Sequence, residues 1–271
     1  MYSISLYLIV FTFVTTLNVA YNQVVENVNW DYLQFVLAWP PSYCSTHECQ
    51  LNPNLRNFTI RGLWATNNPY NPLENCTGEQ FHFQNLSDIQ SELSNSWPDL
   101  KRSTCAKGRW KKEWELHGRC TVDDPSIATQ HGYFEVSLMQ KYKYDVLKVL
   151  EFQGIKPDSS ALIGELQFTD ILQQAYNHRV SLRCRRFPGL KPTHMYIKQG
   201  VKHIRQPLKQ DSNHEVQIQQ LDAVILCLTP QLQLRDCPYD FDVKNRCPSG
   251  FVFAQFNHSF DSNEIPNSGD C

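Results

Sequence analysis

Two short segments of the sequence carry side chains suited to acid–base chemistry at a phosphate. In RWKKEWELHGRC, residues 109–120, Glu113 and His117 are four residues apart, so a helix would place both on one face with Lys112 nearby. A carboxylate beside a histidine and a cation is suited to proton transfer at a phosphodiester. No histidine stands four residues before His117, so the two-histidine zinc signature is absent and no metal is expected.

The second segment, NFTIRGLWATNN at residues 57–68, has an arginine at its centre. Its alternation predicts a strand with Phe58 and Ile60 on one face and Thr59 and Arg61 on the other. Because a guanidinium has a pKa above about 12, Arg61 cannot accept a proton near neutral pH. Its fork of donors can still bind a phosphate. This segment alone therefore predicts anion binding rather than proton transfer.

The elements that position these segments are strands and helices in mixed order. Apolar runs predict strands at 32–40, 180–184 and 221–229, and the first can pair with the strand at 57–65. Apolar spacing at Phe134, Leu138, Tyr142, Val146 and Leu150 predicts a helix ended by Gly154, and Thr169 is a candidate cap for a further helix. We expect a single α+β domain with a central, mainly antiparallel sheet flanked by several helices.

Composition and cysteine content indicate an exported globular protein. The chain has 271 residues, 41% apolar and 19% charged, which excludes disorder. Residues 1–20 hold a short apolar run without charge and predict a cleaved signal peptide rather than a membrane anchor. Ten cysteines without a CxxC pair favour disulfides over a zinc ribbon. Four sequons agree with a secreted or vacuolar glycoprotein: Asn57, Asn75, Asn85 and Asn257.

A basic stretch lies in the second half of the chain. Between Arg179 and Gln210 there are nine lysines and arginines and no acidic residue. Such a stretch is either a solvated loop or a surface that meets a polyanion, because clustered cations supply most non-specific affinity for nucleic acids. Both interpretations remain open from the residues alone.

Taken together, FTIRGLW (58–64) and KEWELHGRC (112–120) resemble the ribonuclease T-two family of secreted acid endoribonucleases. The family's signature segments run Phe/Tyr-Thr-Ile-His-Gly-Leu-Trp-Pro and His-Glu-Trp-x-Lys-His-Gly-Thr-Cys. LQFVLAWPPSYC (33–44) and WPDL (97–100) match as well. The residues of these segments are most similar to the plant branch, which includes the pistil self-incompatibility ribonucleases. The resemblance runs from about Tyr32 to Phe253 and implies a plant source.

The resemblance implies RNA cleavage through a cyclic phosphate, without metal or cofactor, by one histidine that accepts a proton and another that donates one. By this resemblance, His117 matches the second-segment histidine and Glu113 its acidic helper. Trp64 and Gln34 match residues of the base site, and Arg61 in the first segment is a further candidate for RNA binding.

The departures from the family pattern fall at the reactive positions. Arg61 replaces the first-segment histidine, and Lys112 replaces a second-segment histidine as in the self-incompatibility branch. Leu116 replaces the lysine that neutralises the developing charge, while Ala65 and Thr66 replace a proline and a base-site aspartate. Losing one partner of an acid–base pair typically costs about 100- to 10,000-fold in rate. Arg61 therefore indicates lost catalysis with anion binding retained.

The resemblance also implies four disulfides: Cys44–Cys49, Cys76–Cys120, Cys184–Cys247 and Cys227–Cys237. Cys105 lacks its usual partner in the family, and Cys271 is the remaining candidate. The expected organisation is a signal peptide at 1–20, a ribonuclease-like domain at 21–255 with a basic insertion at about 185–215, and a tail at 256–271.

These observations predict a secreted, catalytically impaired ribonuclease homologue with an RNA-binding cleft and a role in polyanion binding, defence or storage. It is expected to be a monomer that binds RNA, without membrane attachment or DNA specificity, and a protein partner is left open. One alternative is an active endoribonuclease in which His82 or His131 fills the missing position. Another is a recognition protein of the self-incompatibility type.

Overall fold

The computed structural model describes residues 28–68, 70–102, 106–186, 196–198, 218–239, 247 and 250–256. Its strands are β1 Tyr32–Ala38, β2 Thr59–Asn67, β3 Asn71–Pro72, β4 Asp158–Ile163, β5 Ser181–Arg186, β6 Tyr196–Lys198, β7 Gln219–Leu228, β8 Leu234–Arg235 and β9 Phe251–Phe253. Its helices are α2 Pro40–Cys44, α3 Gln90–Ser96, α4 Lys107–Leu116, α5 Gln130–Lys143, α6 Val146–Phe152 and α7 Glu165–Tyr176, with short 3-10 helices η1 Phe83–Leu86 and η2 Gly118–Thr121.

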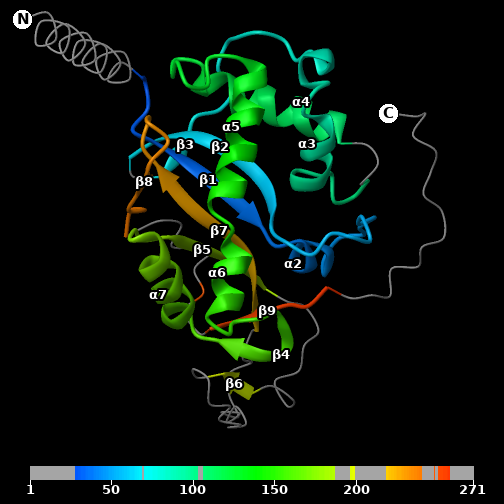
Figure 1. Cartoon of the computed structure of the whole chain (residues 1–271), viewed down its shortest axis with the longest axis vertical. Helices are drawn as coiled ribbons and strands as arrows, with labels where there is room; N and C mark the ends of the chain where they lie inside the picture. Colours follow the sequence, from blue (N-terminus) through cyan, green and yellow to red (C-terminus); the bar gives the residue numbers. More distant parts are fainter. Residues whose placement is uncertain are drawn as a thin grey trace, which may run out of the picture.

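All the strands belong to one sheet, in the order β3-β2-β1-β7-β9-β4-β6, with β5 and β8 also paired to β7 (Figure 1). The pairs are antiparallel except for β7–β9 and β4–β6, which are parallel. The predicted α+β class with a mainly antiparallel sheet is confirmed, as is the pairing of the first two strands.

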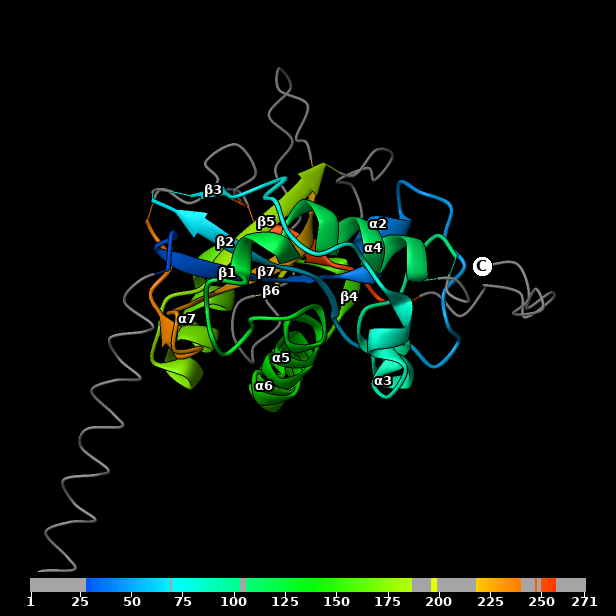
Figure 2. The ribbon, with the colours of Figure 1, turned by 90° about the horizontal axis from the view of Figure 1, so that it is seen from above.

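The main core lies on one face of this sheet. Leu33, Phe35 and Leu37 alternate along β1 into it, and helices α5, α6 and α7 gather on one side of the sheet (Figure 2). Four fully buried tryptophans give the core much of its bulk: Trp39, Trp97, Trp110 and Trp114. We call the opposite face of β1, β2, β7 and β5 the site face.

The helix expected to run up to Gly154 is two helices. Tyr144 ends α5, and Asp145 starts α6 as an N-cap whose side chain accepts a hydrogen bond from the Lys148 backbone N–H. Within α5 a spacing of four residues drifts round the 3.6-residue helix, and Tyr142, which was expected on the buried stripe, is exposed. Gly154 has a φ of 78°, the left-handed conformation that favours glycine after a helix.

The predicted cap of the next helix was wrong. Helix α7 begins at Glu165, and Thr169 lies inside it, where its hydroxyl donates to the Glu165 carbonyl at 3.0 Å. The hydroxyl satisfies itself within the helix, which is the usual alternative to capping. The helix ends at Asn177, whose φ of 56° is one that asparagine tolerates better than most residues.

Two β-bulges shape the site face. Between β1 and β2, Val36 pairs with Gly62 and Leu37 with Ile60, so Arg61 is an extra residue. Between β5 and β7, the pairing steps from Ala223 to Leu221, so Asp222 is likewise extra. A bulge lets two consecutive side chains leave the same face of a sheet.

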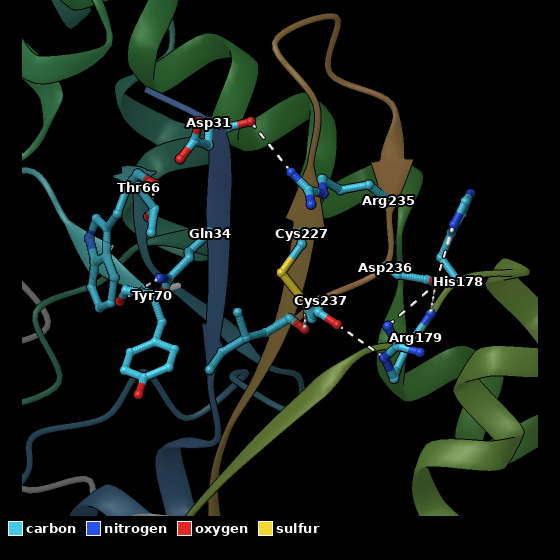
Figure 3. Close-up of a disulfide and its surroundings, with 12 residues drawn as sticks. Asp31, Gln34, Thr66, Tyr70, His178, Arg179, Cys227, Arg235, Asp236 and Cys237 are labelled. Atoms are coloured by element: carbon cyan, nitrogen blue, oxygen red, sulfur yellow. Dashed lines mark hydrogen bonds and ion pairs between the residues drawn. A yellow bond between two sulfur atoms is a disulfide. The ribbon is translucent and has the colours of Figure 1, made fainter. Parts of the chain in front are cut away.

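The four expected disulfides are all present: Cys44–Cys49, Cys76–Cys120, Cys184–Cys247 and Cys227–Cys237. The last is drawn in Figure 3, where the backbone oxygen of Cys237 accepts from the Arg179 Nε at 3.0 Å. The Asp236 carboxylate beside it accepts from the Arg179 backbone N–H at 2.7 Å. Disulfide and hydrogen bonds together fasten the segment after β8 to the start of β5.

Several expectations lie outside the described residues. They are the signal peptide at 1–20, Cys105, Cys271, the sequon at Asn257, residues 257–271 of the tail and most of the basic insertion. Within the described ranges, none of the helices has the length and apolar character needed to cross a bilayer.

Loop length should rank the contributions of the two nested disulfides. Cys184 and Cys247 are 63 residues apart and Cys227 and Cys237 only 10, while all four side chains are buried. Replacing each pair by alanine should therefore cost about 4 kcal/mol for the longer loop and about 3 kcal/mol for the shorter one. Urea denaturation of both double variants measures this ranking. An equal or larger loss for the short loop would contradict the chain-entropy explanation.

Candidate functional site

Helix α4 presents the acid–base pair predicted from the sequence. Glu113 lies in the last turn of the helix, and His117 is its C-cap, with a backbone N–H that donates to the Glu113 carbonyl at 2.9 Å. Both side chains are buried, with about 5% of each residue's surface exposed. Trp110 lies three residues before Glu113 and Trp114 three residues before His117 on the buried side of α4, and their packing in the core prevents the helix from turning these two groups away.

The Glu113 carboxylate is held by two donors. Trp64 Nε1 donates to Glu113 Oε1 at 2.5 Å, and Arg109 Nη2 lies 3.6 Å from Oε2. Burial raises the pKa of Glu113, while the charge of Arg109 and the hydrogen bond from Trp64 oppose that rise. Tyr133, whose hydroxyl accepts from the Leu63 N–H at 3.4 Å, has a pKa raised by burial and by the charge of Glu113.

His117 is fixed on two sides. Its ring lies 4.9 Å from the Trp64 ring, centroid to centroid, and its Nδ1 is 3.1 Å from the backbone oxygen of Leu73. A carbonyl oxygen can only accept, so Nδ1 carries the hydrogen of this bond. Nε2 is therefore the ring nitrogen that can exchange a proton with a ligand.

Gly62 makes room for the contact between Trp64 and Glu113. A Cβ added at Gly62 would overlap Trp64 Nε1 and Glu113 Oε1, both well inside any permitted contact. The glycine is required here by close approach, since its φ is not in the left-handed region.

Arg61 projects from its bulge on the site face. Its Nη1 lies 3.4 Å from Asp222 Oδ2, and its backbone oxygen accepts from Arg109 Nη2 at 2.9 Å. About a third of the Arg61 side chain is exposed, against 5% for Asp222. Burial is the main cause that lowers the pKa of Arg61, and the Asp222 carboxylate opposes it.

The remaining predicted residues are placed unevenly. Trp64 and Gln34 are direct partners across β1 and β2, and both are buried. The Gln34 side chain donates to the Tyr70 backbone oxygen at 3.3 Å (Figure 3). Lys112 is exposed on α4, whereas Leu116 is half-buried. The structure thus brings Glu113 and His117 against Trp64, with Arg61 close enough for its charge to act on Glu113, and leaves Lys112 exposed on α4.

Two charged residues of this neighbourhood, Asp222 and Arg109, were missed from the sequence, and Arg185 was expected only as part of the basic stretch. Asp222 was hidden in an apolar strand, where a lone carboxylate is the available signal. Arg109 stands four residues before Glu113, and Arg185 places its Nε 2.7 Å from Asp222 Oδ1. In the part of the chain that the structure describes, no group of three His, Cys, Asp or Glu side chains is arranged to hold a metal.

Comparison with known proteins identifies the family. The model of the Ribonuclease T2 family matches residues 30–237, and the chain belongs to this family. Ribonuclease Oy of Magallana gigas is 32% identical over 49% of this chain and 64% of its own length. Ribonuclease 3 of Arabidopsis thaliana is 36% identical over 55% of this chain and 68% of its own. Intracellular ribonuclease LX of Solanum lycopersicum is 27% identical over 89% and 91%.

Solved structures have the same fold. Ribonuclease MC1 from the seeds of bitter gourd aligns with a TM-score of 0.64 and 25% identity, over 83% of this chain and all of that one. RNase NT in complex with 5′-AMP aligns with a TM-score of 0.65 and 22% identity, over 84% of this chain and all of that one. Both comparisons confirm the fold class.

The close approach at Gly62 predicts a matched pair of glycine variants. Gly62→Ala should push Trp64 away from Glu113 and cost about 1–3 kcal/mol, the usual range for overpacking. Gly108→Ala, in helix α4, meets no atom within 4 Å. It should be neutral or stabilising by up to about 1 kcal/mol. Thermal denaturation compares them, and equal stability of the two variants would contradict the tight contact.

The raised pKa of Glu113 predicts a pH-dependent difference between wild type and Glu113→Gln. A carboxyl with a raised folded pKa binds its proton more tightly in the folded state, so wild type loses stability as pH rises from about 4.3 through that raised pKa. Glutamine keeps an oxygen for Trp64 and does not titrate. Relative to wild type, the variant should gain stability between pH 4 and pH 7.

Urea denaturation at several pH values between these limits measures that difference. Glu115→Gln, on the more exposed side of the same helix, controls for the loss of a charge from α4. A Glu113→Gln difference that stays constant with pH, or that falls as pH rises, would contradict the assignment.

Proposed function

We propose that this protein binds single-stranded RNA around Arg61 and His117 but cleaves it poorly. The observation that supports this most directly is the ion pair of Arg61 with the buried Asp222. A guanidinium held by a carboxylate stays protonated at neutral pH, so it cannot act as a general base. It retains further N–H donors, and its exposed third can face a phosphate.

The other half of the predicted acid–base machinery supports the family relationship. Glu113, His117 and Trp64 are packed together, and the proton on Nδ1 of His117 leaves Nε2 available for a substrate. One histidine with its carboxylate can complete only one of two proton transfers efficiently. The other transfer then depends on water, which is slower by the factor that general catalysis usually contributes, about 100- to 10,000-fold.

Two further positions support weak catalysis. Leu116, at the position of the family's lysine by sequence resemblance, supplies no charge to the site. Lys112 carries a charge, but it is exposed to solvent on α4. Stabilisation of developing phosphorane charge is therefore expected to be weaker than in relatives with both cations.

The alternative of a substitute histidine has little support. His82 is exposed. Its backbone N–H donates to Gln130 Oε1 and its backbone oxygen accepts from Gln130 Nε2, both at 2.8 Å. His131 pairs with Asp88 at 2.9 Å and lies 3.7 Å from Glu135. These contacts hold both histidines near the start of α5, and within the described residues neither shares a hydrogen bond or ion pair with Arg61, Glu113 or His117.

A secretory route is part of the proposal. Four disulfides favour an oxidising compartment. Asn75 and Asn85 are exposed and suited to glycosylation, whereas the side chain of Asn57 is half-buried and donates to Asp145 Oδ1 at 3.2 Å. Asn75 and Asn85 are therefore the better glycan acceptors.

Four proteins test the proposal in an RNA-cleavage assay: wild type, Arg61→His, Arg61→Gln and the double variant Arg61→His with Leu116→Lys. Wild type should turn over RNA at least about 100-fold more slowly than a relative that has both histidines. Arg61→His should recover part of the rate, and the double variant more, because it adds both the base and the missing cation. Arg61→Gln is the control for simple removal of the arginine.

Wild-type cleavage at the rate of such a relative would contradict impaired catalysis. If the rate were high and equally high in Arg61→Gln, an active endoribonuclease that uses another residue would be the correct assignment. Thermal denaturation of each variant verifies that loss of the pair with Asp222 has not unfolded the protein.

A further inference from the structure

Strand β5 contributes two arginines to the site face. Leu182 and Cys184 point into the main core, so the alternation of the strand sends Arg183 and Arg185 to the opposite face. Arg183 is the direct neighbour of Ala223, one residue from Asp222. Ala223 belongs to a small apolar cluster with Trp64 on the site face, which places Arg183 on the same face as the candidate site.

Arg185 is fixed by Asp222, by Thr46, whose hydroxyl oxygen accepts from Nη1 at 3.0 Å, and by the Tyr43 ring at 5.5 Å. Its charge is compensated by the carboxylate that it shares with Arg61. Arg183 is half-buried. Among the positive neighbours that lower the pKa of Arg61, Arg183 has the largest effect, so its charge lies close to that guanidinium.

Among the residues that the structure describes, the site face carries more arginines than carboxylates. Four arginines, Arg61, Arg109, Arg183 and Arg185, face two carboxylates, Asp222 and Glu113. The whole chain has a formal net charge of −2, so this excess is local rather than a general property. Like charges gathered on a partly desolvated surface raise the local concentration of an anionic ligand and stabilise it once it is bound.

We propose that Arg183 forms a second phosphate-binding subsite, which takes the next phosphodiester of a single-stranded RNA already bound at Arg61. This inference rests on the proposed function, because it extends the same surface along the RNA backbone. Arg185 and Asp222 keep the strand and the first arginine in place, while Arg183 makes the added contact. A backbone phosphate carries no base information, so this subsite adds affinity and not sequence preference.

The test compares a ligand with one phosphate and a ligand with several. The first is a 5′-mononucleotide, the class of ligand in the RNase NT complex. The second is a 2′-O-methyl hexanucleotide, which cannot be cleaved because it lacks the attacking hydroxyl. The variants are Arg183→Gln, Arg183→Lys and the matched control Arg186→Gln. Arg186 is exposed and lies three residues further along β5. By the alternation of the strand, its side chain points to the face opposite that of Arg183.

Arg183→Gln should weaken hexanucleotide binding about fivefold at low salt, the upper end of the range for a partly exposed ion pair. It should also reduce the log–log salt slope by about 0.7, the value for one phosphate contact on a single strand. Mononucleotide binding should change less than twofold. Arg186→Gln should alter neither ligand by more than twofold, and Arg183→Lys should keep the salt slope of wild type.

Equal weakening of hexanucleotide binding by Arg183→Gln and Arg186→Gln would overturn the subsite. So would equal weakening of both ligands by Arg183→Gln, since Arg183 would then belong to the first site. Failure of the proposed function has a different result: wild type itself would bind neither ligand. Thermal denaturation confirms that the variants are folded.

Discussion

A carboxylate that is nearly withdrawn from water has to be matched by positive charge, and Asp222 imposes this constraint on the site face. An uncompensated buried charge costs several kcal/mol, whereas a pair with good geometry restores most of it. Arg61 on β2 and Arg185 on β5 both meet the requirement. Strand β2 pairs with β1 and strand β5 pairs with β7, so the two arginines approach Asp222 from opposite sides of the β1–β7 pair. The two bulges are what make the meeting possible, because regular pairing would not turn these residues toward each other.

The acid–base half of the site depends on a separate set of contacts. Glu113 accepts a hydrogen bond from the indole of Trp64, and this close contact is possible because Gly62 has no side chain. His117 packs against the same indole and bonds the backbone oxygen of Leu73. Arg109 is the link between the halves, since it approaches the Glu113 carboxylate and donates to the backbone of Arg61. A substitution at position 61 can therefore change the chemistry of the site while Glu113 and His117 keep their geometry.

Much of this arrangement could be predicted from the sequence. The β1–β2 pair follows from short apolar runs, the four disulfides from the resemblance to a family, and the shared location of Glu113 and His117 from their spacing. The partner of Arg61 could not be predicted, because 161 residues separate it from Asp222 and a bulge is set by pairing between strands. Two local features were also missed: the N-cap at Asp145, which restarts the helix, and the drift of four-residue spacing, which placed Tyr142 on the wrong face.

The connection between Arg186 and Gln219 begins and ends at neighbouring points of the sheet. Those two residues pair directly across β5 and β7, and Cys184 is tied to Cys247 close by. Since the ladder already fixes both ends, the free energy of closing the connection rises only with the logarithm of its length, by about 0.6 kcal/mol for each doubling. The pairing of β5 with β7 therefore fixes the positions of Arg183 and Arg185, and a change in the length of the connection outside β6 should leave both arginines in place.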